Sequence, residues 1–279
     1  ELKVPEDNPN LPFVHRKNII ENLYGVEFIT DENGFRIGEN KEERIETRKI
    51  LFLGDSFTVG WGVSFDSTIS NLVEGFFERS ADIQAINMGC GNYNTIMEVE
   101  LFKQKGISLK PEIAILSFYI NDLEDTPRIL SNFEYYFMTN FYLYGFLFDK
   151  YIKLKSKYDS DFINNYYQNQ YSNSTRIRKN ADAIRRLAQL CKINNVKLLI
   201  VNIPDLRNLS DYKYNFVSKY INGVADELNI EFLDLFSSVK GSESNRLWVS
   251  DEDPHSNGYA NNIFAKAIYN KINILGWLK

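Results

Sequence analysis

Five short apolar runs, separated by segments with helical periodicity, constrain the fold of this chain more than any other feature. The runs are Ile50–Gly54, Ile83–Asn87, Ile113–Phe118, Lys197–Ile203 and Glu231–Leu235. Strands that are apolar along their length are typical of parallel sheets whose two faces are covered by helices. We therefore predict an α/β fold, a three-layer α/β/α sandwich with a mostly parallel five-stranded sheet.

The segments between these runs carry the spacing of helices. Ile69, Leu72, Val73 and Phe76 recur at positions that form one face of a helix, and the apolar residues of 260–268 form one face of a final helix. Before the first run, residues 1–47 are mixed and polar. We expect this lead-in to pack on the domain as part of a single domain spanning 1–279.

Residues 123–175 interrupt the alternation of strands and helices. The stretch from Phe133 to Phe148 is far richer in Phe and Tyr than the single helix that usually joins two parallel strands. Two interpretations overlap here. One is a helical insertion with a small core of its own, and the other is a cap that lends an apolar wall to a site at the sheet edge.

Composition excludes several classes of protein. The net charge of −5 over 279 residues argues against a nucleic-acid partner, which would favour a basic face. The two cysteines, Cys90 and Cys191, form no CxxC motif, so neither a disulfide framework nor a zinc site is indicated. No run approaches the roughly 20 apolar residues of a membrane span. We therefore expect a soluble domain. Because a start at Glu1 is compatible with removal of an N-terminal signal or anchor, the sequence leaves the cellular compartment open.

The chemistry of the chain centres on Ser56. The run that starts at Leu51 ends in Gly54-Asp55-Ser56, and ligands of open α/β sheets bind just past the carboxyl ends of the strands. A serine hydroxyl needs an adjacent base, usually histidine, to act as a nucleophile. The chain has only two histidines, His15 in the lead-in and His255 in the loop before the last helix. We predict that His255 is the base, with Asp251, Glu252 and Asp253 as candidate acids.

Rival motifs are incomplete. Gly89-Cys-Gly-Asn-Tyr-Asn94 lacks the third glycine of a dinucleotide fingerprint, and the sequence contains no phosphate-binding P-loop. Thr58 replaces the second glycine of the Gly-x-Ser-x-Gly elbow found in α/β-hydrolases. One histidine with loosely spaced carboxylates fits a triad better than a metal site, so we predict no metal and no cofactor.

Four blocks in one order now indicate a family. Gly54-Asp55-Ser56-Phe-Thr, a Gly/Asn-rich turn after the second strand, Asn121-Asp122 after the third strand and an acid close before His255 resemble the SGNH (GDSL-type) hydrolase superfamily. The blocks lie within residues 50–268. The resemblance implies the flavodoxin-like fold of these enzymes, Ser56 as the nucleophile, Asn121 as an amide donor to the oxyanion, and His255 as the base.

The sequence departs from the family pattern at three positions. The glycine that usually gives a backbone N–H to the oxyanion hole falls on Asn92, with Gly91 one position earlier, so the donor stays open between them. The common acid spacing falls on Glu252, yet Asp253-Pro-His-Ser-Asn-Gly258 resembles a variant pattern, and we choose Asp253 over Glu252. Tyr119 stands where glycine is frequent and is expected to narrow the pocket.

The resemblance implies an esterase or acylhydrolase that cleaves a carboxylic ester through an acyl-enzyme on Ser56. Two substrates fit this reading, an O-acetyl group on a carbohydrate and a short-chain lipid ester. Two other functions share the fold. One is an O-acyltransferase that uses the same triad to modify a glycan, and the other is a catalytically silent module that binds glycan. Loops set specificity in such folds, so the sequence leaves the substrate open.

Overall fold

The computed structural model describes residues 2–23, 25–39, 47–77, 82–125 and 161–278. The aromatic group from Phe133 to Phe148 therefore lies outside the described residues. Within the described part, no helix combines the length and the apolar character needed to cross a membrane.

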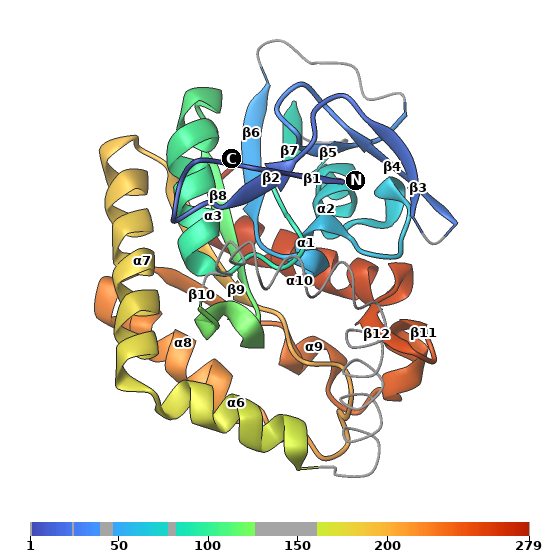
Figure 1. The fold of residues 1–279 in the computed structure, drawn as a ribbon, viewed down its shortest axis with the longest axis vertical. Coiled ribbons are helices and arrows are strands. Elements are labelled where there is room, and N and C mark those ends of the chain that lie inside the picture. Colours follow the sequence, from blue (N-terminus) through green and yellow to red (C-terminus); the bar gives the residue numbers. More distant parts are fainter. Residues whose placement is uncertain (1, 24, 40–46, 78–81, 126–160, 279) are drawn as a thin grey trace, which may run out of the picture.

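The five predicted parallel strands are confirmed as consecutive strands of an eight-stranded sheet, of which β10 forms one edge (Figure 1). They are β6 (Arg48–Leu53), β7 (Ile83–Asn87), β8 (Ile113–Phe118), β9 (Lys197–Asn202) and β10 (Glu231–Asp234). Their spatial order is β10-β9-β8-β6-β7, and each neighbouring pair is parallel. In chain order this arrangement is 2-1-3-4-5, the flavodoxin-like order.

The sheet is larger than predicted because the lead-in joins it. Three antiparallel strands extend the β7 edge, namely β5 (Arg36–Ile37), β4 (Val26–Thr30) and β3 (Ile20–Leu23). A tight turn between β4 and β5 contains Gly34 at φ +84°. The lead-in also forms a separate ribbon of β1 (Lys3–Pro5) and β2 (Phe13–His15).

Two groups of helices cover the sheet. Right-handed crossovers place the helix of a β6-to-β7 connection on one face, and the helices of connections running back toward β10 on the other. Accordingly, α2 packs against α10, while α3 and α8 both contact α7, and Figure 1 shows the two groups on either side of the sheet. These helices are α2 (Ile69–Phe77), α3 (Thr95–Leu101), α7 (Ser174–Ile193), α8 (Asn215–Leu228) and α10 (Gly258–Leu275).

Further elements lie in the connections. The α-helical ones are α1 (Ser56–Val59), α6 (Phe162–Ser172) and α9 (Phe236–Val239). Single turns of 3₁₀ helix are η1 (Phe65–Ser67), η3 (Ile107–Leu109), η4 (Ile120–Leu123) and η5 (Ser244–Leu247), and a π-helical turn, η2 (Phe102–Gly106), follows α3. A second ribbon, β11 (Trp248–Ser250) with β12 (Asp253–Ser256), precedes α10.

The central strands explain the apolar runs of the sequence. Ile50, Leu51, Phe52 and Leu53 of β6 are fully buried, and every residue of β8 is buried as well. Strands that are covered on both faces need apolar side chains at successive positions rather than at alternate ones. The polar residues Asp55, Ser56 and Asn121 follow the ends of these two strands.

Arg36 ties the antiparallel extension to the turn beyond Ser56. Its side chain is only 2% exposed, and its guanidinium donates to the carbonyl oxygens of Val59, Gly60 and Val63 at 2.8, 2.5 and 2.7 Å. Burial lowers the pKa of Arg36 to about 10, which leaves the group charged at neutral pH. This contact links β5 to the segment that follows α1.

Replacing Arg36 with Met is expected to reduce the free energy of unfolding by about 3 kcal/mol, because buried carbonyl oxygens lose their donors. Urea denaturation would measure the loss. Arg246 is exposed, so Arg246→Met serves as the matched control and is expected to change stability little. Equal stability of the two variants would contradict the prediction.

Candidate active site

Ser56 is the first residue of α1, and the turn around it is packed so closely that two neighbouring positions, Gly54 and Gly89, have no room for a side chain. A Cβ at Gly54 would lie 2.0 Å from Thr58 Oγ1, and a Cβ at Gly89 would lie 2.3 Å from the backbone nitrogen of Val59. The turn after β7 thus packs directly on α1. Ser56 sits beside the point where the strand order reverses, between β6 and β8, where ligands bind in folds of this type.

Asp55 organises this turn from within. Its side chain is 1% exposed, and its Oδ1 accepts a hydrogen bond from the backbone N–H of Phe57 at 2.9 Å. Its Oδ2 accepts a hydrogen bond from Asn121 Nδ2 at 3.2 Å. Burial raises the pKa of Asp55, although the hydrogen bonds from Phe57 and Asn121 oppose that shift. One carboxyl group therefore caps α1 and holds a side chain that follows β8.

His255 reaches Ser56 from the β11–β12 ribbon. Its Nε2 lies 2.9 Å from Ser56 Oγ, and its Nδ1 lies 2.5 Å from Asp253 Oδ1. The same aspartate oxygen accepts the backbone N–H of His255 at 3.1 Å, and the imidazole packs on the ring of Phe57 at 4.9 Å. The structure thus brings Ser56, His255 and Asp253 into one hydrogen-bonded chain.

Asp253 rather than Glu252 contacts His255. Glu252 is exposed, as is Asp251. Burial on its own raises the pKa of Asp253, but the hydrogen bonds from the His255 side chain and backbone outweigh it and hold the pKa below its ordinary value. The carboxylate is therefore ionised at neutral pH and can orient an imidazole.

The other histidine has a different environment. His15 is 3% exposed, and its Nε2 lies 3.4 Å from Cys90 Sγ. Burial, assisted by the positive charge of Lys3, lowers the pKa of His15 to about 4, and burial raises the pKa of the Cys90 thiol to about 12. Both groups are thus neutral near pH 7, which suits a structural contact.

The remaining predicted site residues line one cavity with Ser56 and His255. This cavity has a volume of about 680 Å³, and Gly91, Asn92 and Asn121 all contribute to its wall. Asn92 has φ +67°, a left-handed conformation that asparagine tolerates better than most residues. Asn121 Nδ2 carries a second hydrogen besides the one directed at Asp55. Which backbone N–H donates, that of Gly91 or that of Asn92, stays a prediction.

Several cavity residues were missed from the sequence. They are Lys3 from β1, Trp61 from the segment after α1, Tyr167 from α6 and Arg207 from the segment after β9. Lys3 Nζ donates to the backbone oxygen of Gly91 and to Asn92 Oδ1, the latter at 3.1 Å, so the lead-in supports this turn. Arg207 follows the end of β9, and this position could have predicted that it lies near the site. Nothing in the sequence predicted that Lys3 contacts this turn.

Tyr119 forms part of the cavity wall, while the expected narrowing of the pocket stays a prediction. Its ring lies 4.4 Å from that of Phe57, and its hydroxyl donates to Asp205 Oδ2 at 2.9 Å. The side chain is therefore fixed at both its ring and its hydroxyl.

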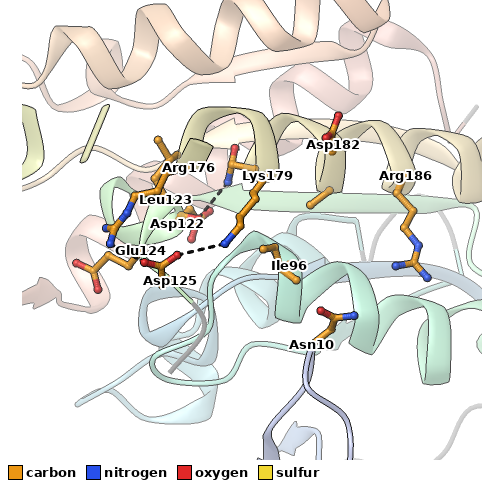
Figure 2. A pocket seen from close by; sticks show the side chains of 12 residues that line it. Asn10, Ile96, Asp122, Leu123, Glu124, Asp125, Arg176, Lys179, Asp182 and Arg186 are labelled. Carbon is orange, nitrogen blue, oxygen red and sulfur yellow. Dashed lines mark hydrogen bonds and ion pairs between the residues drawn. The ribbon is translucent and has the colours of Figure 1, made fainter. Parts of the chain in front are cut away.

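A second cavity, of about 660 Å³, lies between α3, α7 and η4 and contains none of the three linked residues (Figure 2). Its basic side chains are matched by acids. Arg176 and Lys179 lie 2.6 and 3.7 Å from the carboxylate of Asp125, and Arg186 lies 3.5 Å from Glu100. In the described part of the chain, no group of three or more His, Cys, Asp or Glu side chains could hold a metal ion.

A serine, a histidine and an aspartate linked at the carboxyl edge of a flavodoxin-like sheet define a hydrolase of the SGNH type. The chain belongs to the GDSL-like lipase/acylhydrolase family, whose sequence model matches residues 52–261. It is an ester hydrolase of that family. A search of curated protein sequences finds no match.

Solved structures share the fold at low sequence identity. TesA matches with a TM-score of 0.55 and 11% identity, over 82% of this chain and 99% of its own. The acetylxylan esterase Axe2 from Geobacillus stearothermophilus matches with a TM-score of 0.52 and 16% identity, over 83% and 96%. A two-domain esterase, CEX, which is active on acetylated mannans, matches with a TM-score of 0.53 and 16% identity, over 82% of this chain and 49% of its own.

Behind the site lies a buried carboxyl group, that of Glu98 in α3. The side chain is 1% exposed, and no described residue makes a hydrogen bond to either carboxyl oxygen. Burial raises its pKa well above the ordinary value, and the nearby charges of Asp122 and Asp55 add to the shift. The folded protein therefore binds this proton more tightly than the unfolded chain does.

The Glu98→Gln variant is expected to gain stability over the parent as the pH rises from about 5 to about 8, by at most about 1.4 kcal/mol per pH unit. The raised pKa favours folding below the unfolded-state pKa, and this contribution is lost as the pH rises toward the folded-state pKa. Urea unfolding at both pH values would measure the gain. The exposed Glu243→Gln is the control, and a Glu98→Gln effect independent of pH would contradict the prediction.

Proposed function

We propose that this protein is a serine esterase that cleaves a carboxylic ester through an acyl-enzyme intermediate on Ser56. The observation that carries the proposal is the hydrogen-bonded chain from Ser56 Oγ through both nitrogens of His255 to Asp253. This is the arrangement in which a hydroxyl becomes a nucleophile, because a base adjoins it and a third group orients the base.

In the first step, Ser56 Oγ attacks the ester carbonyl carbon while His255 Nε2 accepts the hydroxyl proton. Asp253 holds the Nδ1 proton of the imidazole and stabilises the positive charge that develops on the ring. The lowered pKa of Asp253 supports this role, since the carboxylate stays ionised. His255 then gives its proton to the departing alcohol, which leaves the acyl group on Ser56.

The negative charge on the carbonyl oxygen is met by three donors in this proposal. They are the backbone N–H of Ser56, the backbone N–H of Asn92 or Gly91, and Asn121 Nδ2. Asp55 fixes the Asn121 amide from behind at 3.2 Å, so the donor is positioned before the substrate binds. Water, activated by His255, then attacks the acyl-enzyme and releases the acid.

For the substrate we favour an O-acetyl group on a carbohydrate over a short-chain lipid ester. The cavity wall contains the aromatic side chains of Trp61, Tyr119 and Tyr167, which suit the faces of sugar rings. Two structural neighbours, an acetylxylan esterase and an esterase active on acetylated mannans, support the same choice.

The Asn121→Ala variant is expected to lower kcat for an aryl acetate by about 10²–10³, the usual cost of one oxyanion donor. Ser56→Ala is expected to abolish acyl-enzyme formation and cause a larger loss. Steady-state kinetics and labelling by a fluorophosphonate probe would measure both effects. Parent protein that turns over no ester and takes up no probe at Ser56 would refute the proposal.

A second experiment separates hydrolysis from acyl transfer. Incubation with an aryl acetate, with and without an oligosaccharide acceptor, is followed by mass spectrometry of the sugar. Release of acetate without acceptor is expected. Acetylation of the sugar, with turnover only in its presence, would instead identify an O-acyltransferase that uses the same three residues. If neither acetate release nor sugar acetylation occurs, the protein is a binding module.

A further inference from the structure

The charges on the wall of the Ser56 cavity are opposite in sign to the charge of the whole protein. The chain carries a net charge of −5, yet neither Asp nor Glu is among the described residues that line this cavity. The basic residues on its wall are Lys3, Arg207, His255 and His15, and His15 is neutral near pH 7 because its pKa is lowered to about 4. A cleft lined by one sign of charge concentrates ligands of the opposite sign.

Arg207 is held in a fixed position at this wall. Asp205, only 1% exposed, accepts the backbone N–H of Arg207 through Oδ1 at 2.9 Å, and its Oδ2 lies 3.0 Å from Arg207 Nη1. The hydroxyl of Tyr119 donates to that same Oδ2. The arginine is therefore anchored to a buried carboxylate that is itself anchored to the cavity wall.

The guanidinium has donors to spare beyond this anchor. An arginine side chain carries five N–H donors in a planar fork that matches a carboxylate. The Arg207 side chain is 35% exposed and lines the cavity, whereas its Nη1 is buried beside Asp205 and Tyr214 makes a hydrogen bond to the same side chain. Asp205 and Tyr214 thus hold the guanidinium in place, and the exposed part of this side chain borders the cavity.

Lys3 adds positive charge on the other side of Ser56. Its ammonium contacts the oxygen atoms of Gly91 and Asn92 and lies 4.3 Å from the ring centre of Phe13, and these partners are all neutral. In the sheet order, the turn that Lys3 contacts follows β7, whereas Arg207 follows β9. The strand that leads into Ser56, β6, lies between them.

We propose that the substrate is an anionic ester, with a carboxylate that Arg207 binds and whose approach Lys3 favours. The inference rests on the proposed esterase function and specifies its substrate class. The carboxylate belongs to the acyl part or to the alcohol part of the ester, as in an acetylated acidic sugar. In both cases Arg207 binds a carboxylate of the substrate.

Two pairs of aryl esters distinguish these sources. In the first, para-acetoxybenzoate carries the carboxylate on the alcohol part and para-acetoxybenzamide is its neutral partner. In the second, para-nitrophenyl hydrogen adipate carries it on the acyl part and para-nitrophenyl adipamate is neutral. For at least one pair, the parent protein is expected to show a kcat/KM for the anionic ester about tenfold above that of its neutral partner.

Arg207→Gln is expected to reduce this preference about tenfold, mainly through KM, because a charge-assisted hydrogen bond to the substrate is lost. Lys266, which is exposed on α10 and does not line the cavity, provides the control Lys266→Gln, expected to keep the preference. Two results would overturn this inference and leave the esterase proposal intact. One is turnover of the neutral esters with no preference for the anionic ester in either pair, and the other is a preference for the anionic ester that survives Arg207→Gln.

Binding to the Ser56→Ala variant tests the same point without catalysis. Calorimetry with the four esters is expected to show tighter binding of the anionic member of a pair, and the double variant Ser56→Ala/Arg207→Gln is expected to lose that difference. Equal binding of both members in each pair would refute the carboxylate site. A preference seen in binding, with no turnover by the parent protein, would support this site while refuting the esterase proposal.

Discussion

The arrangement of this site depends on one buried carboxyl group, that of Asp55. It caps the short helix that begins with Ser56 and also receives the amide of Asn121. These partners come from segments that follow two different strands, β6 and β8, which are neighbours in the sheet. A single side chain therefore sets the spacing between the hydroxyl and the amide, and the sheet beneath fixes the orientation of both.

Three acidic side chains are buried behind the site, and their burial disfavours the ionised form of each. Burial raises the pKa values of Asp55, Asp122 and Glu98, so the protonated form of each is favoured relative to water. Asp122 is partly compensated by hydrogen bonds from Thr95 and from the backbone of Tyr119. On the opposite side of Ser56, hydrogen bonds keep Asp253 acidic. The carboxyl groups around the site therefore differ in pKa because their burial and their hydrogen bonds differ.

The sequence predicted most of the fold and the linked residues for identifiable reasons. Parallel strands that are buried on both faces produce apolar runs, and Ser56 was found because it follows such a run. His255 was found as one of only two histidines, and Asn121 through the family resemblance. The pairing of the lead-in with the β7 edge of the sheet was not foreseen, since pairing at a sheet edge leaves little pattern in a short polar segment. Lys3 was likewise invisible, because its contact with the turn after β7 joins residues 88 or more positions apart. The choice between Gly91 and Asn92 stays open, because every residue except proline has a backbone N–H.

His255 lies outside the large sheet, on one of the two two-stranded ribbons in the described part of the chain. His255 belongs to the two-stranded β11–β12 ribbon, which is not part of the eight-stranded sheet. The side chains of Trp248 and Asn257 fasten this ribbon, through bonds to the carbonyl oxygens of Leu206, Arg246 and Trp248. Small ribbons open more readily than buried parallel strands, and local opening exposes few apolar groups. His255 and Asp253 are therefore carried by an element separate from the sheet that positions Ser56 and Asn121, so the alignment of imidazole and hydroxyl depends on the contacts that hold this ribbon in place.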